Sequence, residues 1–304
     1  MNDTDGASPG WPARESRWLT EIKRLNPLRD AERIVYLDTC YEFPFDIPHS
    51  LELAFLRTFA VPSIAELLGS TGEFVDRARK RYDDTDLLIS TFAEHGHSTP
   101  TGRAAIRRMN QIHSRFAISN DDFVYVLSTM VLEPFRWIER FGWRPALAAE
   151  RAATLHFWHK VGRLMNITDI PATLDELDRF NVEFEQSRFA YTEAGHSIAR
   201  AMIDMFVDRI PGVPKRLGAR AVCAPLDEPL LEALGLPKPA AWERRTVETA
   251  LKLRGRAVRI RPPSRTPHLR TKARRPTYPS GYRVEELGPP PPGAPIGEHE
   301  MPPD

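Results

Sequence analysis

Apolar residues recur every three or four positions along most of the chain from about residue 27 to residue 259. This spacing places them on one face of an α-helix, and it is clearest at Val124, Leu127, Val131 and Phe135. The alternation expected of a half-buried strand is almost absent, and we find no repeat of about 20 to 50 residues. The chain is therefore predicted to be all-α, with helices over residues 30–42, 47–59, 73–96, 99–116, 119–142, 146–166, 173–189, 192–208 and 242–259.

Several of these helices begin at residues that favour capping. Ser70 and Glu73 have the spacing of a capping box, which predicts that one long helix begins there and ends near residue 96. Thr99 and Ser119 each precede a helical pattern and are typical N-cap residues. Pro134 lies inside the pattern of the helix that follows Ser119, so we expect a kink in that helix.

Composition changes near the C-terminus. Twelve of the 28 prolines lie in residues 262–303, and residues 254–283 contain ten Lys or Arg and no Asp or Glu. Proline lacks a backbone donor, so this tail is not expected to form one regular helix. We expect an N-terminal arm at residues 1–27, a single helical domain at 28–260 and an irregular, proline-rich, basic extension at 261–304. The extension fits either a solvated segment that wraps the domain or a short-range contact with anionic lipid or RNA.

Charge and cysteine content exclude several classes of protein. The formal net charge is +1, so no global field favours nucleic acid, and we expect no specific nucleic-acid partner. Two cysteines, Cys40 and Cys223, are too few for a disulfide scaffold or a thiolate metal cluster. The chain has neither a run of about 18 apolar residues nor a signal-like start. We therefore expect a cytoplasmic protein, peripheral to a membrane if the basic tail binds lipid, and histidine as the ligand of any metal.

One histidine lies on an apolar helix face. In the 99–116 helix, the face formed by Ile106, Met109, Ile112 and Phe116 also contains His113. Two interpretations are open at this point. His113 is either a core histidine bonded to a backbone carbonyl, or a neutral imidazole that ligates haem iron in an apolar cavity.

A polar pair lies on the preceding predicted helix. Arg81 and Thr85 are four residues apart, so they lie on the same face, at the edge of an apolar stripe. A guanidinium beside an apolar stripe is costly unless it meets an anion. That anion is either a protein carboxylate such as Asp84 or an acidic group of a cofactor, with the Thr85 hydroxyl next to it.

A second group of histidines offers an alternative metal site. His156 and His159 are three residues apart on one predicted helix, and Glu193 and His196 form a Glu-x-x-His motif on another. A di-iron bundle needs two such motifs in helices and two further glutamates, and no second motif lies in a predicted helix. Signature loops of P-loop NTPases, dinucleotide enzymes, zinc proteases and α/β-hydrolases are absent. A haem-free helical protein with another metal on these four residues remains an alternative.

Four longer stretches carry a family resemblance. The chain resembles the haem-dependent oxygenases that include the latex-clearing rubber oxygenases and the MpaB-type oxygenases of mycophenolic acid biosynthesis, and it is more similar to the MpaB-type branch. The resemblance is strong over about residues 34–209 and weaker in YPSGYRVEELGP from Tyr278. The stretches that carry it are CYEFPFDIPHSLELAFLRTFAVPSIAELL from Cys40, KRYDDT from Lys80, RMNQIHSRFAISNDDFVYVLSTMVLEPFRWIERFGWRP from Arg108 and FWHKVGRLMNITDIP from Phe157.

The resemblance implies a fold, a cofactor and a reaction. It implies an all-α fold with a globin-like core that holds haem b, with His113 as the axial iron ligand and Arg81 and Thr85 beside the haem. It implies oxidation with O2 as co-substrate, of a small hydrophobic substrate such as an isoprenoid alkene, with cleavage of its carbon–carbon double bond. The rubber-cleaving branch carries a lysine just before the threonine, and this chain has Asp84 there.

Two rival functions stay open at the level of sequence. The first is a non-catalytic haem or gas-binding protein on the same fold. The second is the non-haem metal protein that uses His156, His159, Glu193 and His196. The sequence predicts neither the identity of the substrate nor the oligomeric state.

Overall fold

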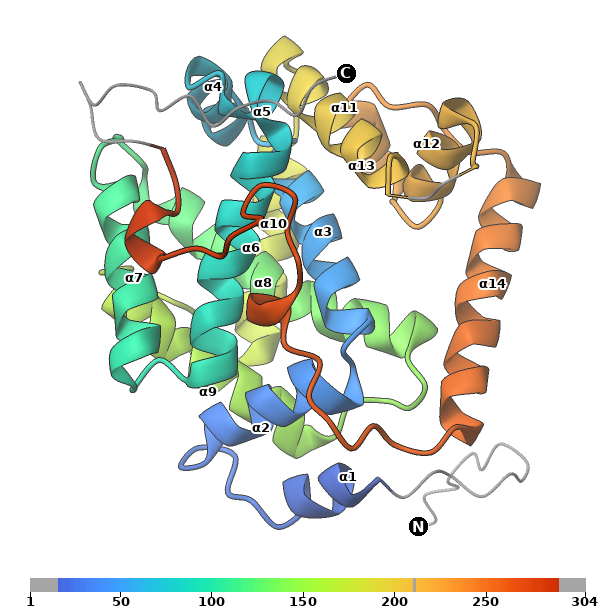
Figure 1. Cartoon of the computed structure of the whole chain (residues 1–304). Helices are drawn as coiled ribbons and strands as arrows, with labels where there is room; N and C mark the ends of the chain where they lie inside the picture. The colour runs from blue at the N-terminus through green and yellow to red at the C-terminus, as the bar shows by residue number, and fades with distance from the viewer. Residues whose placement is uncertain (1–15, 210–211, 290–304) are drawn as a thin grey trace, which may run out of the picture.

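The computed structural model describes residues 16–209 and 212–289, and these form a helical body (Figure 1). Apart from one isolated bridge between Arg275 and Tyr278, the described residues contain no β-structure, so the all-α prediction is confirmed. The helices are α1 (Arg17–Ile22), α2 (Ala31–Leu37), a π-helix (Asp38–Glu42), α3 (Asp46–Thr58), α4 (Pro62–Ser70), α5 (Glu73–Asp76), α6 (Ala78–His95), α7 (Pro100–His113), α8 (Asn120–Phe141), α9 (Ala148–Leu164), α10 (Leu174–Arg188), α11 (Glu193–Val207), α12 (Lys215–Cys223), α13 (Glu228–Ala233) and α14 (Ala241–Ile260), followed by two short 3₁₀ turns (Arg270–Lys272 and Val284–Glu286).

Side-chain caps begin many of the long helices. Thr99 accepts a hydrogen bond from the backbone N–H of Gly102, and Ser119 accepts one from that of Asp122, which confirms both predicted caps. The threonines before α10 and α11 act in the same way. α8 runs through Pro134 as a single helix of 22 residues.

The predicted helix over residues 73–96 is wrong in its first part. Ser70 is the last residue of α4, and its hydroxyl donates to the Leu67 carbonyl instead of capping a new helix. Gly72 then turns the chain with a positive φ of 67°, a conformation that glycine adopts without strain. α5 and α6 are separate helices, divided at Arg77. Four short helices, α1, α4, α12 and α13, have no counterpart in the sequence prediction.

The core is organised around α8. This helix is buried along most of its length, and it packs against α3, α9, α10 and α14. α6 packs between α2, α7 and α11. One buried contact that fixes α3 on α8 is the hydrogen bond from Trp137 Nε1 to Asp46 Oδ1, at 3.0 Å. A cavity lies where α6 and α7 face α3, α4 and α8.

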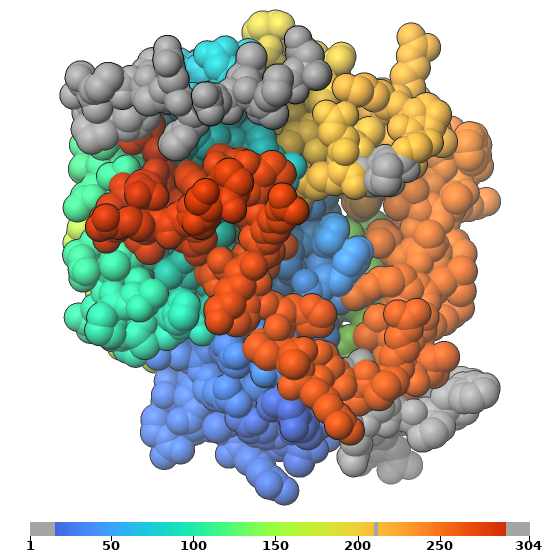
Figure 2. All heavy atoms as spheres, viewed as in Figure 1, coloured from blue at the N-terminus to red at the C-terminus, as the bar shows by residue number. Residues whose placement is uncertain are grey.

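The C-terminal segment does not end at α14. From the end of this helix it returns across the body, over α6 and towards α7 (Figures 1 and 2). We call residues 270–289 the C-terminal strap. Arg275 of the strap lies 3.0 Å from Asp83 of α6, and Arg108 of α7 donates a hydrogen bond of 2.7 Å to the carbonyl of Leu287, whose side chain is fully buried. The described part of the tail therefore packs against the helical body.

The predicted N-terminal arm also contributes to the core. Ile22 of α1 is fully buried, and the ring of Trp18 lies 4.0 Å from that of Tyr41. The predicted division of the chain into an arm, a domain and an extension, with boundaries at residues 27 and 260, stays a prediction. The polar start at residues 1–10 and most of the proline run after Pro289 lie outside the described residues. Within the described ranges, no helix is long and apolar enough to cross a membrane.

Candidate functional site

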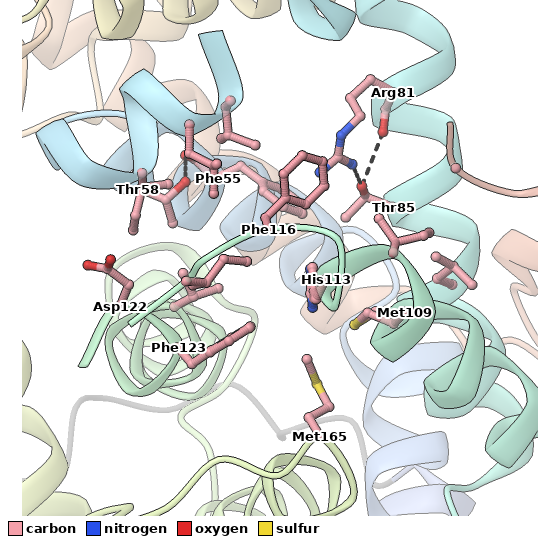
Figure 3. A pocket seen from close by; sticks show the side chains of 18 of the residues that line it. Phe55, Thr58, Arg81, Thr85, Met109, His113, Phe116, Asp122, Phe123 and Met165 are labelled. Carbon is pink, nitrogen blue, oxygen red and sulfur yellow. Dashed lines mark hydrogen bonds between the residues drawn. The ribbon is translucent and has the colours of Figure 1, made fainter. Parts of the chain in front are cut away.

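A cavity of about 610 Å³ lies between the helices that carry the predicted site residues (Figure 3). This volume is in the range of about 300 to 1,000 Å³ that is typical of ligand and cofactor pockets. Its wall comes from α3 to α9, from the loop after α7 and from Gly288 and Pro289 of the strap. Most of the wall is aliphatic or aromatic, with a few polar groups: Thr58, Ser63, Ser70, Thr71, Glu73, Arg81, Asp84, Thr85, His113, Arg115 and Asp122.

His113 is the last residue of α7 and lies at the cavity wall. Its Nδ1 atom is buried and has no hydrogen-bond partner among the described residues, and its ring lies 5.3 Å from that of Phe123. Burial, and next the charge of Arg81, lower the pKa of His113 to about 4. The imidazole is therefore neutral at neutral pH, which is the form that binds a metal. Since Nδ1 is unpaired, the structure does not support a core histidine bonded to a carbonyl through this atom.

Arg81 and Thr85 face the same cavity from α6. The Arg81 guanidinium donates to the Thr85 hydroxyl, which in turn donates to the Arg81 carbonyl at 3.1 Å (Figure 3). The guanidinium also lies 5.0 Å from the ring of Phe74. Within the described part of the chain, no carboxylate lies within 4 Å of Arg81, and burial lowers the pKa of Arg81 although Asp84 and Glu73 act to raise it. A half-buried cation at a cavity wall, without an ion-pair partner, is suited to an anionic ligand.

Asp84 lies at the cavity wall but is bound to other groups. Lys80 Nζ is 2.8 Å from its Oδ2, and the Tyr278 hydroxyl of the strap donates to its Oδ1. Lys80 also donates to the carbonyl of Gly288 at 3.3 Å. Burial, and next the hydrogen bond to Asp84, raise the pKa of Tyr278, so this phenol stays protonated and keeps donating. The carboxylate therefore joins α6 to the strap instead of pairing with Arg81.

The structure brings together the three residues that the family resemblance implies for the haem site. His113, Arg81 and Thr85 come from two helices, and all three line one cavity. The sequence did not indicate the strap residues of the wall or the role of Tyr278. The spacing of Lys80 and Asp84 could have suggested their ion pair, but no local signal predicts that Tyr278, 194 residues after Asp84, reaches the same carboxylate.

The alternative metal site is not formed, so that prediction is wrong. His159 Nε2 is 2.9 Å from the carbonyl of Pro171, and His196 Nδ1 is 2.8 Å from that of Leu234. Glu193 accepts a hydrogen bond from Tyr191, its near neighbour in sequence. Across residues 16–209 and 212–289, no three His, Cys, Asp or Glu side chains are placed to hold a metal ion. His159 and His196 are instead bonded to backbone carbonyls in different parts of the fold.

Comparison with known proteins places the chain in a family. The model of the family described as "ER-bound oxygenase mpaB/B'/Rubber oxygenase, catalytic domain" matches residues 53–260. The chain belongs to this family. The matched region contains His113, Arg81 and Thr85 and ends at the last residue of α14, so the strap that closes the cavity lies beyond it.

Two curated members of the mpaB/rubber-oxygenase family illustrate the degree of similarity. ER-bound oxygenase mpaB of Penicillium roqueforti is 26% identical over 211 residues, which cover 64% of this chain and 71% of that protein. ER-bound oxygenase mpaB' of Penicillium brevicompactum is 25% identical over 217 residues, which cover 66% of this chain and 51% of that protein. The chain thus spans about half the length of the second relative. Family membership places the protein among the oxygenases.

A solved structure supports the fold independently. The structure of the latex clearing protein LCP in its closed state superposes with a TM-score of 0.54 at 16% sequence identity. The superposition covers 80% of this chain and 71% of that one. At this level of identity the likeness concerns the fold alone, and it agrees with the all-α architecture.

Proposed function

We propose that this mpaB/rubber-oxygenase family member is a haem b-dependent oxygenase that oxidises a small hydrophobic alkene of isoprenoid type with O2, by cleavage of its double bond. The observation that carries the proposal is the neutral His113 with an unpaired ring nitrogen at the wall of an apolar cavity of about 610 Å³. The second support is Arg81, a half-buried cation at the wall of the same cavity, with no carboxylate of the described residues within 4 Å.

The residues of the cavity fit haem b by their chemistry. Haem is a largely apolar macrocycle that carries two carboxylates and needs an axial ligand. His113 would serve as that ligand, the aliphatic and aromatic wall would pack on the macrocycle, and Arg81 would pair with a carboxylate group, with the Thr85 hydroxyl fixing the guanidinium. When bound, haem supplies the iron that binds and activates dioxygen.

The protein contributes position and dryness to the reaction. The apolar wall excludes water and holds an alkene in a limited set of orientations, which lowers the entropic part of the barrier. Leu88, Phe92 and Leu127 are among the apolar residues that would contact the substrate or the cofactor. Asp84 is engaged by Lys80 and Tyr278, so its carboxylate is fixed at the wall where the rubber-cleaving branch carries a lysine.

The first test is the visible spectrum of purified protein. We expect wild type to show a Soret band and a pyridine haemochrome of haem b, and His113→Ala to lose both. His196→Ala is the matched control, because His196 also lies on a helix but bonds to a backbone carbonyl outside the cavity. Stoichiometric haem in His113→Ala, or equal loss of haem in both variants, would reject the assignment of the ligand.

The second test separates catalysis from simple binding of a gas. Reduced wild-type protein is mixed with O2 and an isoprenoid alkene, and oxygen consumption is followed together with carbonyl products by mass spectrometry. We expect two carbonyl fragments per alkene consumed. Reversible O2 binding without any product, across isoprenoid alkenes of different chain length, would favour the non-catalytic haem protein.

A further inference from the structure

The outward face of α14 carries a line of exposed apolar side chains. α14 runs along one edge of the molecule (Figure 1). On it, Trp242 is 65% exposed, Leu253 53% and Ile260 74%. These residues are 11 and 7 positions apart, so at about 100° per residue they lie within about 20° of one another. The line is about 27 Å long.

Basic residues flank this line on one side. Arg245, Lys252, Arg256 and Arg259 are exposed, and at about 100° per residue they follow the same flank of the helix. The cationic face is therefore parallel to the apolar line, with about the geometry of a helix that lies in an interface.

Both acidic residues of α14 are paired with arginines of other helices. Glu243 is buried and binds Arg220, and Glu248 pairs with Arg140 of α8 at 3.1 Å. Unlike the four basic residues of the exposed row, Arg254 points inward and pairs with the buried Asp46 at 2.6 Å. The exposed face of α14 thus contains four cations and no carboxylate.

We propose that the outward face of α14 docks on the surface of a membrane that contains anionic phospholipids, with the helix axis parallel to the membrane. Trp242, Leu253 and Ile260 would enter the boundary between headgroups and acyl chains, where tryptophan is favoured, and the basic row would meet the lipid phosphates and carboxylates. The strap is a weaker basis for such a contact, because Arg270 and Arg275 are committed to Asp86 and Asp83.

Charge argues against a second copy of the chain as the occupant. A symmetric dimer through this face would bring two sets of four cations together with no exposed carboxylate on α14 to pair with them.

No residue of α14 lines the cavity, so the docking surface is separate from the proposed haem site. Variants of this face are therefore expected to leave the haem content unchanged.

The test is co-sedimentation of the full chain with vesicles of phosphatidylcholine, with and without phosphatidylserine, at near-physiological salt. We expect wild type to bind only the vesicles with phosphatidylserine. Since each basic residue near an anionic surface contributes about a fivefold factor, Lys252→Gln with Arg256→Gln is expected to weaken binding by more than tenfold. The charge-matched control is Arg103→Gln with Arg107→Gln, two exposed arginines four residues apart on α7.

Two further measurements test the role of the apolar side chains of α14. The tryptophan fluorescence of wild type should shift to the blue on vesicles, and Trp242→Phe should bind but lose that part of the shift. Leu253→Ser with Ile260→Ser should weaken binding while circular dichroism stays unchanged. Equal loss in the Arg103 and Arg107 control, equal binding to pure phosphatidylcholine, or dimers in ultracentrifugation that only the α14 variants abolish would overturn the proposal.

Discussion

The ion pair between Asp83 and Arg275 anchors the C-terminal strap, and its removal is the most informative test of the fold. The Asp83 side chain is fully buried, that of Arg275 is 9% exposed, and the atoms Oδ1 and NH1 are 3.0 Å apart. Thr277 donates to the other carboxylate oxygen at 2.7 Å, and Arg79 lies 3.1 Å from it. Two of these partners, Arg275 and Thr277, belong to the strap, whereas Arg79 belongs to α6 itself. Arg275 also pairs with Asp86 of α6.

Arg275→Met removes the strap cation but keeps most of its apolar stem. Removing one partner of a buried ion pair costs about 3 to 5 kcal/mol, because the other charge stays buried without compensation. Since Arg79 and Thr277 still bind Asp83, we expect the lower end, about 3 kcal/mol. The double variant Asp83→Asn, Arg275→Met removes both charges, so its loss of stability should be smaller than the sum of the single losses by about 1 to 3 kcal/mol.

The assay is urea unfolding combined with hydrogen exchange of peptides from residues 270–289. A loss of about 3 kcal/mol in strap stability corresponds to about 100-fold faster exchange there, with little change in α8. The control is Arg283→Met, since Arg283 is 77% exposed and its pair with Glu285 at 3.6 Å is worth little. Additive single losses, or an equal effect of Arg283→Met, would refute the reasoning.

Three further predictions concern the cavity and its helices. In haem-free protein, the pKa of His113 in the fold, about 4, lies below its ordinary value of 6.5. The unfolded chain therefore binds more protons between these pH values, and stability should fall by up to about 3 kcal/mol as pH drops from 6.5 to 4. In urea unfolding, His113→Phe should lack this loss of stability. If wild type and His113→Phe lose the same stability between pH 6.5 and 4, the prediction is contradicted. Gly288→Ala should lower Tm more than Gly281→Ala: both glycines have positive φ, but only at Gly288 would a Cβ clash with Ile112. Equal shifts in Tm would show that Ile112 moves aside. Ser119→Ala should cost about 1 kcal/mol in urea unfolding by removal of the α8 cap, and an unchanged midpoint would mean that solvent replaces it.

Three residues of the strap bear on the proposed chemistry. Gly288 and Pro289 belong to the cavity wall, and Tyr278 holds Asp84 at that wall. A strap that opens would admit water to the cavity and release the Asp84 carboxylate. Stability of the strap and dryness of the proposed haem site are therefore expected to change together.

The sequence by itself determined the fold class and the positions of the long helices. Helical periodicity and caps such as Thr99 and Ser119 act over one or two turns, so they can be recognised without tertiary contacts. The same local logic placed Arg81 and Thr85 on one face of a helix and His113 on an apolar one, and the longer matching stretches then linked these residues to an oxygenase family.

Only the tertiary structure decided which residues meet. The capping-box spacing at Ser70 predicted the start of a helix that does not begin there, because α4 continues to Ser70 and Gly72 then turns the chain. The four residues of the alternative metal site failed to assemble, because helix packing directs two of its histidines to separate backbone carbonyls. The contact between Tyr278 and Asp84 joins segments 194 residues apart, and such a pairing depends on the packing of the whole body, which no local spacing encodes.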